Sequence, residues 1–211
     1  MRCFVFCSAQ IDSYDFLKSF DFEKSFIICA DGGYKHTQKL GLVPDLWIGD
    51  GDSLKNGHIA AKEIIAFPPQ KDNTDTDLAV MEALRRGYKD IIILGALGGR
   101  LDHEYSHFCL LKKILDNGGR GTLLDSDNEI TMENKRFSVF PDDKKYISFF
   151  PFGGDVNDFC VKGLYYETEN MHLVSGEVQA SSNCFVDEKI GEISFSSGYI
   201  LVIRSNDSKE G

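Results

Sequence analysis

The sequence predicts an α/β protein in which a doubly wound, mostly parallel sheet domain precedes a small antiparallel β-sandwich domain. Two observations predict this fold class. Up to residue 126, short apolar runs alternate with amphipathic segments, a pattern typical of parallel strands joined by crossover helices. From about residue 127, short β-like runs follow one another with Asn, Asp, Gly and Pro between them and no helical period. We therefore expect two domains, residues 1–126 and 127–211.

Six apolar runs are expected to form the strands of the first domain. Four of them are nearly continuous in Val, Ile, Leu and Phe, which suits strands that are buried on both faces of a parallel sheet. The six runs are residues 3–6, 25–30, 46–50, 63–67, 90–97 and 121–126.

Two segments between these strands have the apolar spacing of amphipathic helices. In residues 74–87, Gly87 is the expected end signal. The side chains expected near one face of this helix are Leu78, Met81, Ala83 and Leu84. In residues 102–119, we expect Asp102 to be the N-cap and Gly118 to stop the helix.

The second domain is expected to consist of short strands and turns. Its β-like runs are residues 128–134, 136–141, 144–152, 158–166, 177–187 and 191–203. Short strands at this spacing predict an antiparallel sandwich.

Composition and charge narrow the function classes. The formal net charge is −10, which is the wrong sign for holding a nucleic-acid backbone, so we expect no nucleic-acid partner. Six cysteines are scattered without a CxxC pair, and no apolar run approaches the length of a membrane span. We expect a cytoplasmic protein with reduced thiols and no membrane partner.

Acidic residues follow the ends of several predicted strands. Asp31 follows residues 25–30, Asp50 ends the next run, and Asp52 lies two residues further on. Because the carboxyl ends of parallel strands meet at one edge of a sheet, where α/β proteins bind ligands, these loops should converge on one cleft. Taken singly, each cluster is also consistent with ordinary turns and helix caps.

More charged residues follow the fourth and fifth strands. Asp72, Asp75 and Asp77 open the first helix, with Lys71 just before them and Arg100 in the Gly-Gly-Arg loop before the second helix. Carboxylate ligands favour Mg²⁺, which completes its shell with water and substrate phosphates, and the basic groups can hold phosphate oxygens. The combination predicts phosphoryl transfer from a nucleotide.

A competing pattern, HExxH, is formed by His103, Glu104 and His107 and is typical of zinc peptidases. The pair of histidines begins in the first turn of its helix, and the sequence offers no clear third ligand; Glu129 is the nearest conventional candidate. A zinc-dependent hydrolase is therefore an alternative hypothesis.

The motifs ADGG, GDGDS, KDNTDTDLA and GGRLDH, in this order and at these gaps, resemble those of the thiamine pyrophosphokinase family. The resemblance covers the whole chain, and a non-catalytic protein that binds thiamine or a nucleotide is a further alternative hypothesis. The resemblance implies transfer of a pyrophosphoryl group from ATP to the hydroxyl of thiamine, which gives thiamine diphosphate and AMP, with Mg²⁺ required. It also implies a homodimer of an ATP-binding α/β domain and a thiamine-binding β-sandwich domain, with the vitamin bound between the two subunits.

Site residues carry over from this resemblance motif by motif. Asp50, Asp52 and Asp75 would bind Mg²⁺ and the polyphosphate, and Arg100 and Asp102 would join them in catalysis. The residues implied at the ATP site are Asp31, Lys71, Asp72, Thr74, Arg100 and Asp102. Ser182 and Asn183 match the Ser-Asn pair that helps to form the thiamine pocket.

The sequence departs from the family pattern at several positions. Gly51 replaces the aromatic residue common between the two acids, and the CSAQI segment after the first strand lacks an expected glycine. Trp47 is the only tryptophan and is expected in the core, so a second-domain tryptophan cannot stack on the thiamine ring. Phe185 or Tyr199 is the expected substitute.

Overall fold

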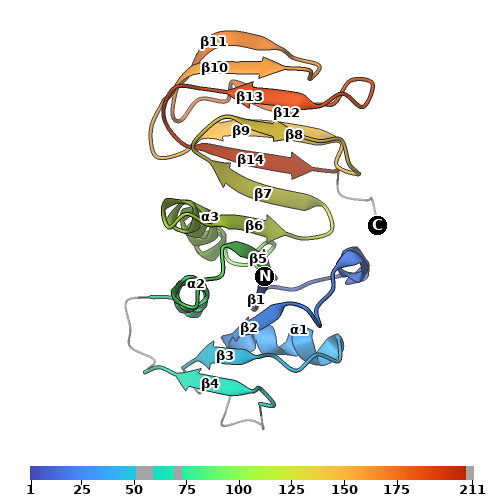
Figure 1. Ribbon diagram of the computed structural model, residues 1–211, viewed down its shortest axis with the longest axis vertical. Coiled ribbons are helices and arrows are strands. Elements are labelled where there is room, and N and C mark those ends of the chain that lie inside the picture. Colours follow the sequence, from blue (N-terminus) through green and yellow to red (C-terminus); the bar gives the residue numbers. More distant parts are fainter. Residues whose placement is uncertain (51–58, 69–72, 208–211) are drawn as a thin grey trace. The chain divides into compact units, whose positions relative to one another are not determined.

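The computed structural model describes residues 1–50, 59–68 and 73–207. The chain divides into two compact units, Met1–Ser126 and Asp127–Gly211, each considered separately below (Figure 1). No helix of the described residues is both long and apolar enough to cross a membrane.

The first unit is built on a parallel sheet with the strand order β6-β5-β1-β2-β3-β4. Its strands are β1 (Arg2–Phe6), β2 (Phe26–Ala30), β3 (Leu46–Gly49), β4 (Glu63–Ala66), β5 (Asp90–Leu94) and β6 (Arg120–Leu124). The chain builds outward from β1 to β4 and then returns to place β5 on the other side of β1. The sheet therefore has its topological switch point between β1 and β5, and the predicted doubly wound α/β class is confirmed.

The described part of this unit contains three α-helices: α1 (Tyr34–Lys39), α2 (Asp75–Arg85) and α3 (Leu101–Asp116). The short 3-10 turns η1 (Asp15–Ser19) and η2 (Asp31–Gly33) accompany them. Helix α1 was not predicted because its buried side chains, His36 and Thr37, are polar and give no apolar period.

The N-terminus of α3 differs from the prediction. Arg100, with extended backbone angles, is the N-cap, and Asp102 lies inside the first turn. Glu104 reaches back to accept a hydrogen bond from the Gly99 backbone N–H at 2.7 Å, while Asp102 accepts one from the His103 N–H at 3.0 Å. Two carboxylates of the first turn thus satisfy backbone donors, so the helix begins before the residue that looks like its cap.

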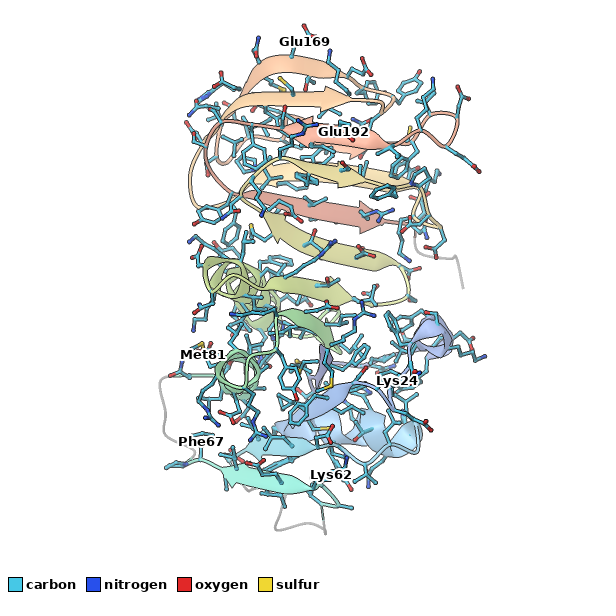
Figure 2. The ribbon with its side chains drawn as sticks, viewed as in Figure 1. Lys24, Lys62, Phe67, Met81, Glu169 and Glu192 are labelled. Carbon is cyan, nitrogen blue, oxygen red and sulfur yellow. The ribbon has the colours of Figure 1, made fainter. Side chains whose placement is uncertain are left out.

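The buried face of α2 also differs from the predicted one. Thr76, Ala79, Val80 and Ala83 are buried, whereas Met81 is 40% exposed on the outer side of the helix (Figure 2). The small residues allow α2 to lie close against β1, β2 and β3, so the helix buries its alanine stripe and leaves the larger apolar side chain outside.

The described residues of the second unit form a sandwich of two antiparallel layers with four strands each, as predicted. Within this unit the layers have the strand orders β12-β9-β14-β7 and β11-β10-β13-β8. The bounds are β7 (Asn128–Glu133), β8 (Phe137–Val139), β9 (Tyr146–Pro151), β10 (Val156–Lys162), β11 (Thr168–Leu173), β12 (Ala180–Asn183), β13 (Gly191–Ser194) and β14 (Ile200–Ser205). Strand β11 was missed because TENMHL is largely polar. Phe149 and Phe159, one from each sheet, pack with ring centroids 5.6 Å apart in the common core.

Candidate functional site

Two adjoining pockets lie at the carboxyl edge of the parallel sheet. The first, here the acidic pocket, has a volume of about 270 Å³ and is lined by Ser8, Ala30, Asp31, Asp50, Asn73, Thr74, Asp75, Thr76 and His103. The second, here the arginine pocket, has a volume of about 380 Å³ and is lined by Cys7, Ser8, Ala9, Thr76, Gly95, Ala96, Gly99, Arg100, His103, Glu104 and His107. Ser8, Thr76 and His103 belong to both, so the pockets share walls.

The positions of the lining residues in the chain explain why the pockets occur here. Segments directly after β1, β2 and β3 reach the acidic pocket, and segments after β1 and β5 reach the arginine pocket. The strands β1 and β5 flank the switch point, where the chain leaves the sheet in opposite directions and opens a crevice. The predicted convergence of strand-end loops on one edge is therefore what the structure has.

Among the described residues, three with carboxylate side chains line the acidic pocket. Asp31 follows β2 with φ at +44°, and its backbone oxygen accepts a hydrogen bond at 3.1 Å from the fully buried Trp47 indole. Trp47 is thus a core residue, as predicted, that also fixes the Asp31 backbone. Asp50 follows β3 directly, and Asp75 is the first residue of α2.

The acidic side chains in the first turn of α2 have different surroundings. The Thr74 hydroxyl caps the helix by accepting a hydrogen bond from the Asp77 N–H at 3.1 Å, and Thr74 lines the acidic pocket beside Asp75. Asp77 instead binds Lys113 of α3 at 2.6 Å. Of the acids that open this helix, Asp75 lines the pocket and Asp77 ties the helix to its neighbour.

Magnesium fits the donors of the acidic pocket only with help from other oxygen ligands. In the described part of the chain, no three His, Cys, Asp or Glu side chains are grouped closely enough to hold a metal by themselves. Mg²⁺ commonly takes one or two carboxylates and fills its shell with water and phosphate oxygens, so Asp50 and Asp75 are a suitable protein contribution. Three predicted site residues, Asp52, Lys71 and Asp72, lie outside the described residues, as does Gly51.

Arg100 and Asp102 form an ion pair with two hydrogen bonds at the N-terminus of α3. The Arg100 Nε and Nη2 atoms donate to Asp102 at 3.1 and 2.6 Å, and both side chains are largely exposed. The Arg100 guanidinium lowers the pKa of Asp102. Arg100 lines the arginine pocket, whereas Asp102 lines neither pocket. A phosphate could take the place of the Asp102 carboxylate because both present oxygens to the guanidinium fork.

The HExxH residues are placed at the same edge. His103 lines both pockets, and the buried His107 bonds through Nδ1 to the Ala96 carbonyl at 2.8 Å. Glu104 is held by the Gly99 amide. Within the described ranges, no third side chain joins the two histidines to make a metal site. Ser8 and Thr76 were not predicted as wall residues because they belong to no distinctive pattern, and His103 was predicted only as part of the HExxH pattern.

The second unit has a pocket of its own, here the tyrosine pocket, with a volume of about 380 Å³. Its lining residues are Phe159, Val161, Tyr166, Thr168, Met171, Gln179, Ala180, Ser181, Ser182 and Asn183. Both predicted residues, Ser182 and Asn183, line it. The aromatic side chains at its wall are Phe159 and Tyr166, and neither Phe185 nor Tyr199, the expected ring-stacking residues, lines it.

Asn183 is almost fully buried and is engaged with backbone groups. Its side-chain oxygen accepts hydrogen bonds from the Tyr166 and Cys184 N–H groups at 3.0 and 2.9 Å, and its nitrogen donates to the Tyr166 oxygen at 2.8 Å. Ser182 has φ at +57°, and its N–H donates to the Ser148 hydroxyl at 2.9 Å. The Ser-Asn pair therefore lies on a strained, tightly held segment.

Comparison with known proteins agrees with this architecture in both units. Residues 17–120 match the family described as "Thiamin pyrophosphokinase, catalytic domain", and residues 128–200 match "Thiamin pyrophosphokinase, vitamin B1 binding domain". The chain is 32% identical over 192 residues to the thiamine pyrophosphokinase of Bacillus subtilis (strain 168), which covers 88% of this chain and 89% of that protein.

Solved structures extend the similarity to the fold. The crystal structure of thiamine pyrophosphokinase from Bacillus subtilis superposes with a TM-score of 0.86 and 27% identity, over 98% of this chain and 100% of that one. The thiamin pyrophosphokinase family protein from Enterococcus faecalis gives 0.87 and 27%, over 99% and 100%.

The chain belongs to the thiamine pyrophosphokinase family. Its activity is that of a thiamine diphosphokinase: the transfer of a pyrophosphoryl group from ATP to the hydroxyl of thiamine, which gives thiamine diphosphate and AMP. This membership replaces the alternatives of a zinc-dependent hydrolase and of a non-catalytic binding protein.

Proposed function

We propose that the acidic and arginine pockets together bind ATP as its Mg²⁺ complex, and that Met1–Ser126 is the ATP-binding catalytic domain. The observation that carries this proposal is the meeting of Asp31, Asp50 and Asp75 in a pocket that shares walls with the pocket of Arg100. Two negatively charged groups, a triphosphate and a set of carboxylates, can share one site only if a cation lies between them.

The proposed roles rest on this placement for the described residues and on the family resemblance for Asp52, Lys71 and Asp72. Asp50, Asp52 and Asp75 hold the metal, and Arg100 neutralises charge that develops on the transferred group when the thiamine hydroxyl attacks the β-phosphorus. Lys71, Asp72, Thr74 and Asp31 complete the ATP site. Because Asp75 lines the acidic pocket and Asp102 does not, we assign the orientation of the attacking hydroxyl to Asp75.

For the second unit, we propose that Asp127–Gly211 is the thiamine-binding domain and that the tyrosine pocket takes part in binding the vitamin. The pocket combines apolar and aromatic walls with hydroxyl and amide groups, which suits an aromatic, heterocyclic alcohol. Ser182 and Asn183 would contribute to the pocket. We also propose a homodimer, with thiamine bound between the two subunits, and a cytoplasmic location.

The test is the rate of AMP formation from ATP, thiamine and Mg²⁺ by variants of the acidic pocket. Asp50→Asn keeps the size of the side chain and removes its charge, and should lower kcat by about 100-fold or more, as is usual when one electrostatic group is removed from a phosphate-transfer site. Asp21→Asn, which neutralises a surface acid paired with Lys24, is the matched control and should be unchanged. A fully active Asp50→Asn enzyme would contradict the proposed site.

A further inference from the structure

The segment after β1, residues 7–9, forms a wall of both pockets at the switch point. Cys7, Ser8 and Ala9 line the arginine pocket, and Ser8 also lines the acidic pocket. This segment begins the CSAQI sequence, in which no glycine occurs. Its conformation therefore depends on what surrounds it.

Among the described residues, four hydrogen bonds hold the backbone of this segment. Two come from the sheet and the turn after β5: the Cys7 N–H donates to Leu94 O at 2.7 Å, and the Ala9 N–H donates to Gly95 O at 2.9 Å. The other two come from adjacent side chains of α1. Lys35 Nζ donates to Ser8 O at 2.6 Å, and His36 Nε2 bonds to Ala9 O at 2.8 Å.

The contacts of His36 define its protonation. A carbonyl oxygen can only accept, so Nε2 carries a hydrogen, and in the neutral ring Nδ1 then accepts from the Tyr14 hydroxyl, 2.7 Å away. The side chain is 1% exposed, and burial lowers its pKa, so the ring is neutral near pH 7. The Ala9 carbonyl thereby fixes the tautomer, and Tyr14 holds the orientation of the ring through Nδ1.

Gly95 leaves the segment no room to shift toward β5. A Cβ at Gly95 would lie 2.6 Å from Cys7 O, 3.1 Å from His36 Nε2 and 3.2 Å from Ala9 O. The histidine ring, the turn after β5 and residues 7–9 are thus packed to contact. His36 itself lines neither pocket.

We propose that His36, oriented by Tyr14, is a positioning residue that sets residues 7–9 as the wall against which the ATP phosphates bind, with Lys35 holding the same wall from its exposed side. The proposal rests on the ATP site proposed above. No residue of this set needs to touch the nucleotide, because each acts through the backbone of Ser8 or Ala9.

The experiment compares KM for ATP, KM for thiamine and kcat in a set of full-length variants. His36→Leu removes the donor at similar volume, and His36→Gln keeps an amide N–H that can reach Ala9 O. Tyr14→Phe removes the partner of Nδ1 that orients the ring. Lys35→Met removes the hydrogen bond to Ser8 O at an exposed position. Lys24→Met, which makes the same charge change at a surface pair with Asp21, is the control.

The expected result is a KM for ATP raised about three- to tenfold in His36→Leu, Tyr14→Phe and Lys35→Met, the factor equivalent to one lost hydrogen bond. The KM for thiamine should be unchanged, and His36→Gln should recover much of the loss. A role in folding alone would lower the active fraction, and hence kcat, without moving KM for ATP.

Two outcomes separate this proposal from the one on which it rests. If Asp50→Asn loses activity while Tyr14→Phe and Lys35→Met keep the original KM for ATP, the positioning role is wrong and the ATP site stands. If Asp50→Asn and Asp75→Asn are both fully active, the ATP site is wrong and the positioning role falls with it.

Discussion

The side-chain amide of Asn183 grips the backbone of Tyr166 from both sides, since its oxygen accepts from the Tyr166 N–H and its nitrogen donates to the Tyr166 carbonyl oxygen. These residues lie in separate segments of the second unit, and both line the tyrosine pocket. The family resemblance assigns Asn183 to thiamine. From its contacts, we expect Asn183 to affect thiamine binding largely by holding Tyr166 in position.

We expect Asn183→Ala to destabilise the protein by about 1–3 kcal/mol, because the polar backbone groups of Tyr166 would lose buried partners. KM for thiamine should rise while KM for ATP stays constant. Urea denaturation and steady-state kinetics measure the two effects. Asn134→Ala, at an exposed position of the same unit, should be neutral in both. A stable Asn183→Ala protein with unaltered thiamine kinetics would show that the hydrogen bonds from Asn183 to the Tyr166 backbone do not contribute to thiamine binding.

Gly33 illustrates why the ADGG motif needs its second glycine. A Cβ at this position would lie 1.9 Å from the backbone oxygen of Phe6 in β1. Backbone cannot yield as a flexible side chain does, so Gly33→Ala should lower the free energy of unfolding by about 1–3 kcal/mol or more. Gly154→Ala, where nothing lies within 4 Å of the added Cβ, should change stability little. Equal stabilities of the two variants would contradict the close packing of η2 on β1.

The buried histidines predict the pH dependence of stability above pH 5. Burial lowers the pKa of His36 and of His107, so the unfolded chain binds protons more readily than the folded one. The contribution of the two histidines to the free energy of unfolding should therefore be complete above their pKa in the unfolded chain, about 6.5. It should fall as the pH drops toward their lower pKa values in the folded protein.

Carboxylates change the free energy of unfolding at lower pH than the histidines do, so the two contributions can be separated. The pKa of Glu82, for example, is lowered to about 2, chiefly by Arg85, so its contribution persists until well below pH 5. Urea titrations at pH 7.5, 6.5 and 5.5 would measure the histidine effect, and His36→Gln should flatten the curve. A curve that is flat between pH 7.5 and 5.5 in the original protein would be inconsistent with two buried neutral histidines.

Asp52 gives a prediction that depends on the GDGD spacing alone, because the residue lies outside those the structure describes. Asp52→Asn should reduce kcat by about 100-fold while leaving KM for thiamine nearly unchanged, as expected for a metal ligand that acts on the phosphates. Steady-state rates of AMP formation at varied thiamine concentration would separate the two constants. A normal kcat would remove Asp52 from the proposed metal ligands.

Local sequence patterns predict much of this fold. The buried strands could be located because continuous runs of Val, Ile and Phe have few alternatives, and the convergence of Asp31, Asp50 and Asp75 follows from parallel topology. Other features depend on tertiary contacts that a sequence pattern does not carry. The N-cap at Arg100 depends on Glu104 reaching back to Gly99, and α1 buries the polar pair His36 and Thr37 because their partners come from other segments.

The central claim is that the carboxylates of the acidic pocket bind a divalent cation together with the triphosphate. Its most direct test is a titration with Mn²⁺, which prefers the same oxygen ligands as Mg²⁺. Binding is monitored by electron paramagnetic resonance in the presence of a non-hydrolysable ATP analogue. The account predicts that Asp50→Asn and Asp75→Asn weaken Mn²⁺ binding at least about tenfold relative to the original protein and to Asp21→Asn, a loss of about 1.4 kcal/mol or more. Equal Mn²⁺ affinity in all four proteins would contradict it.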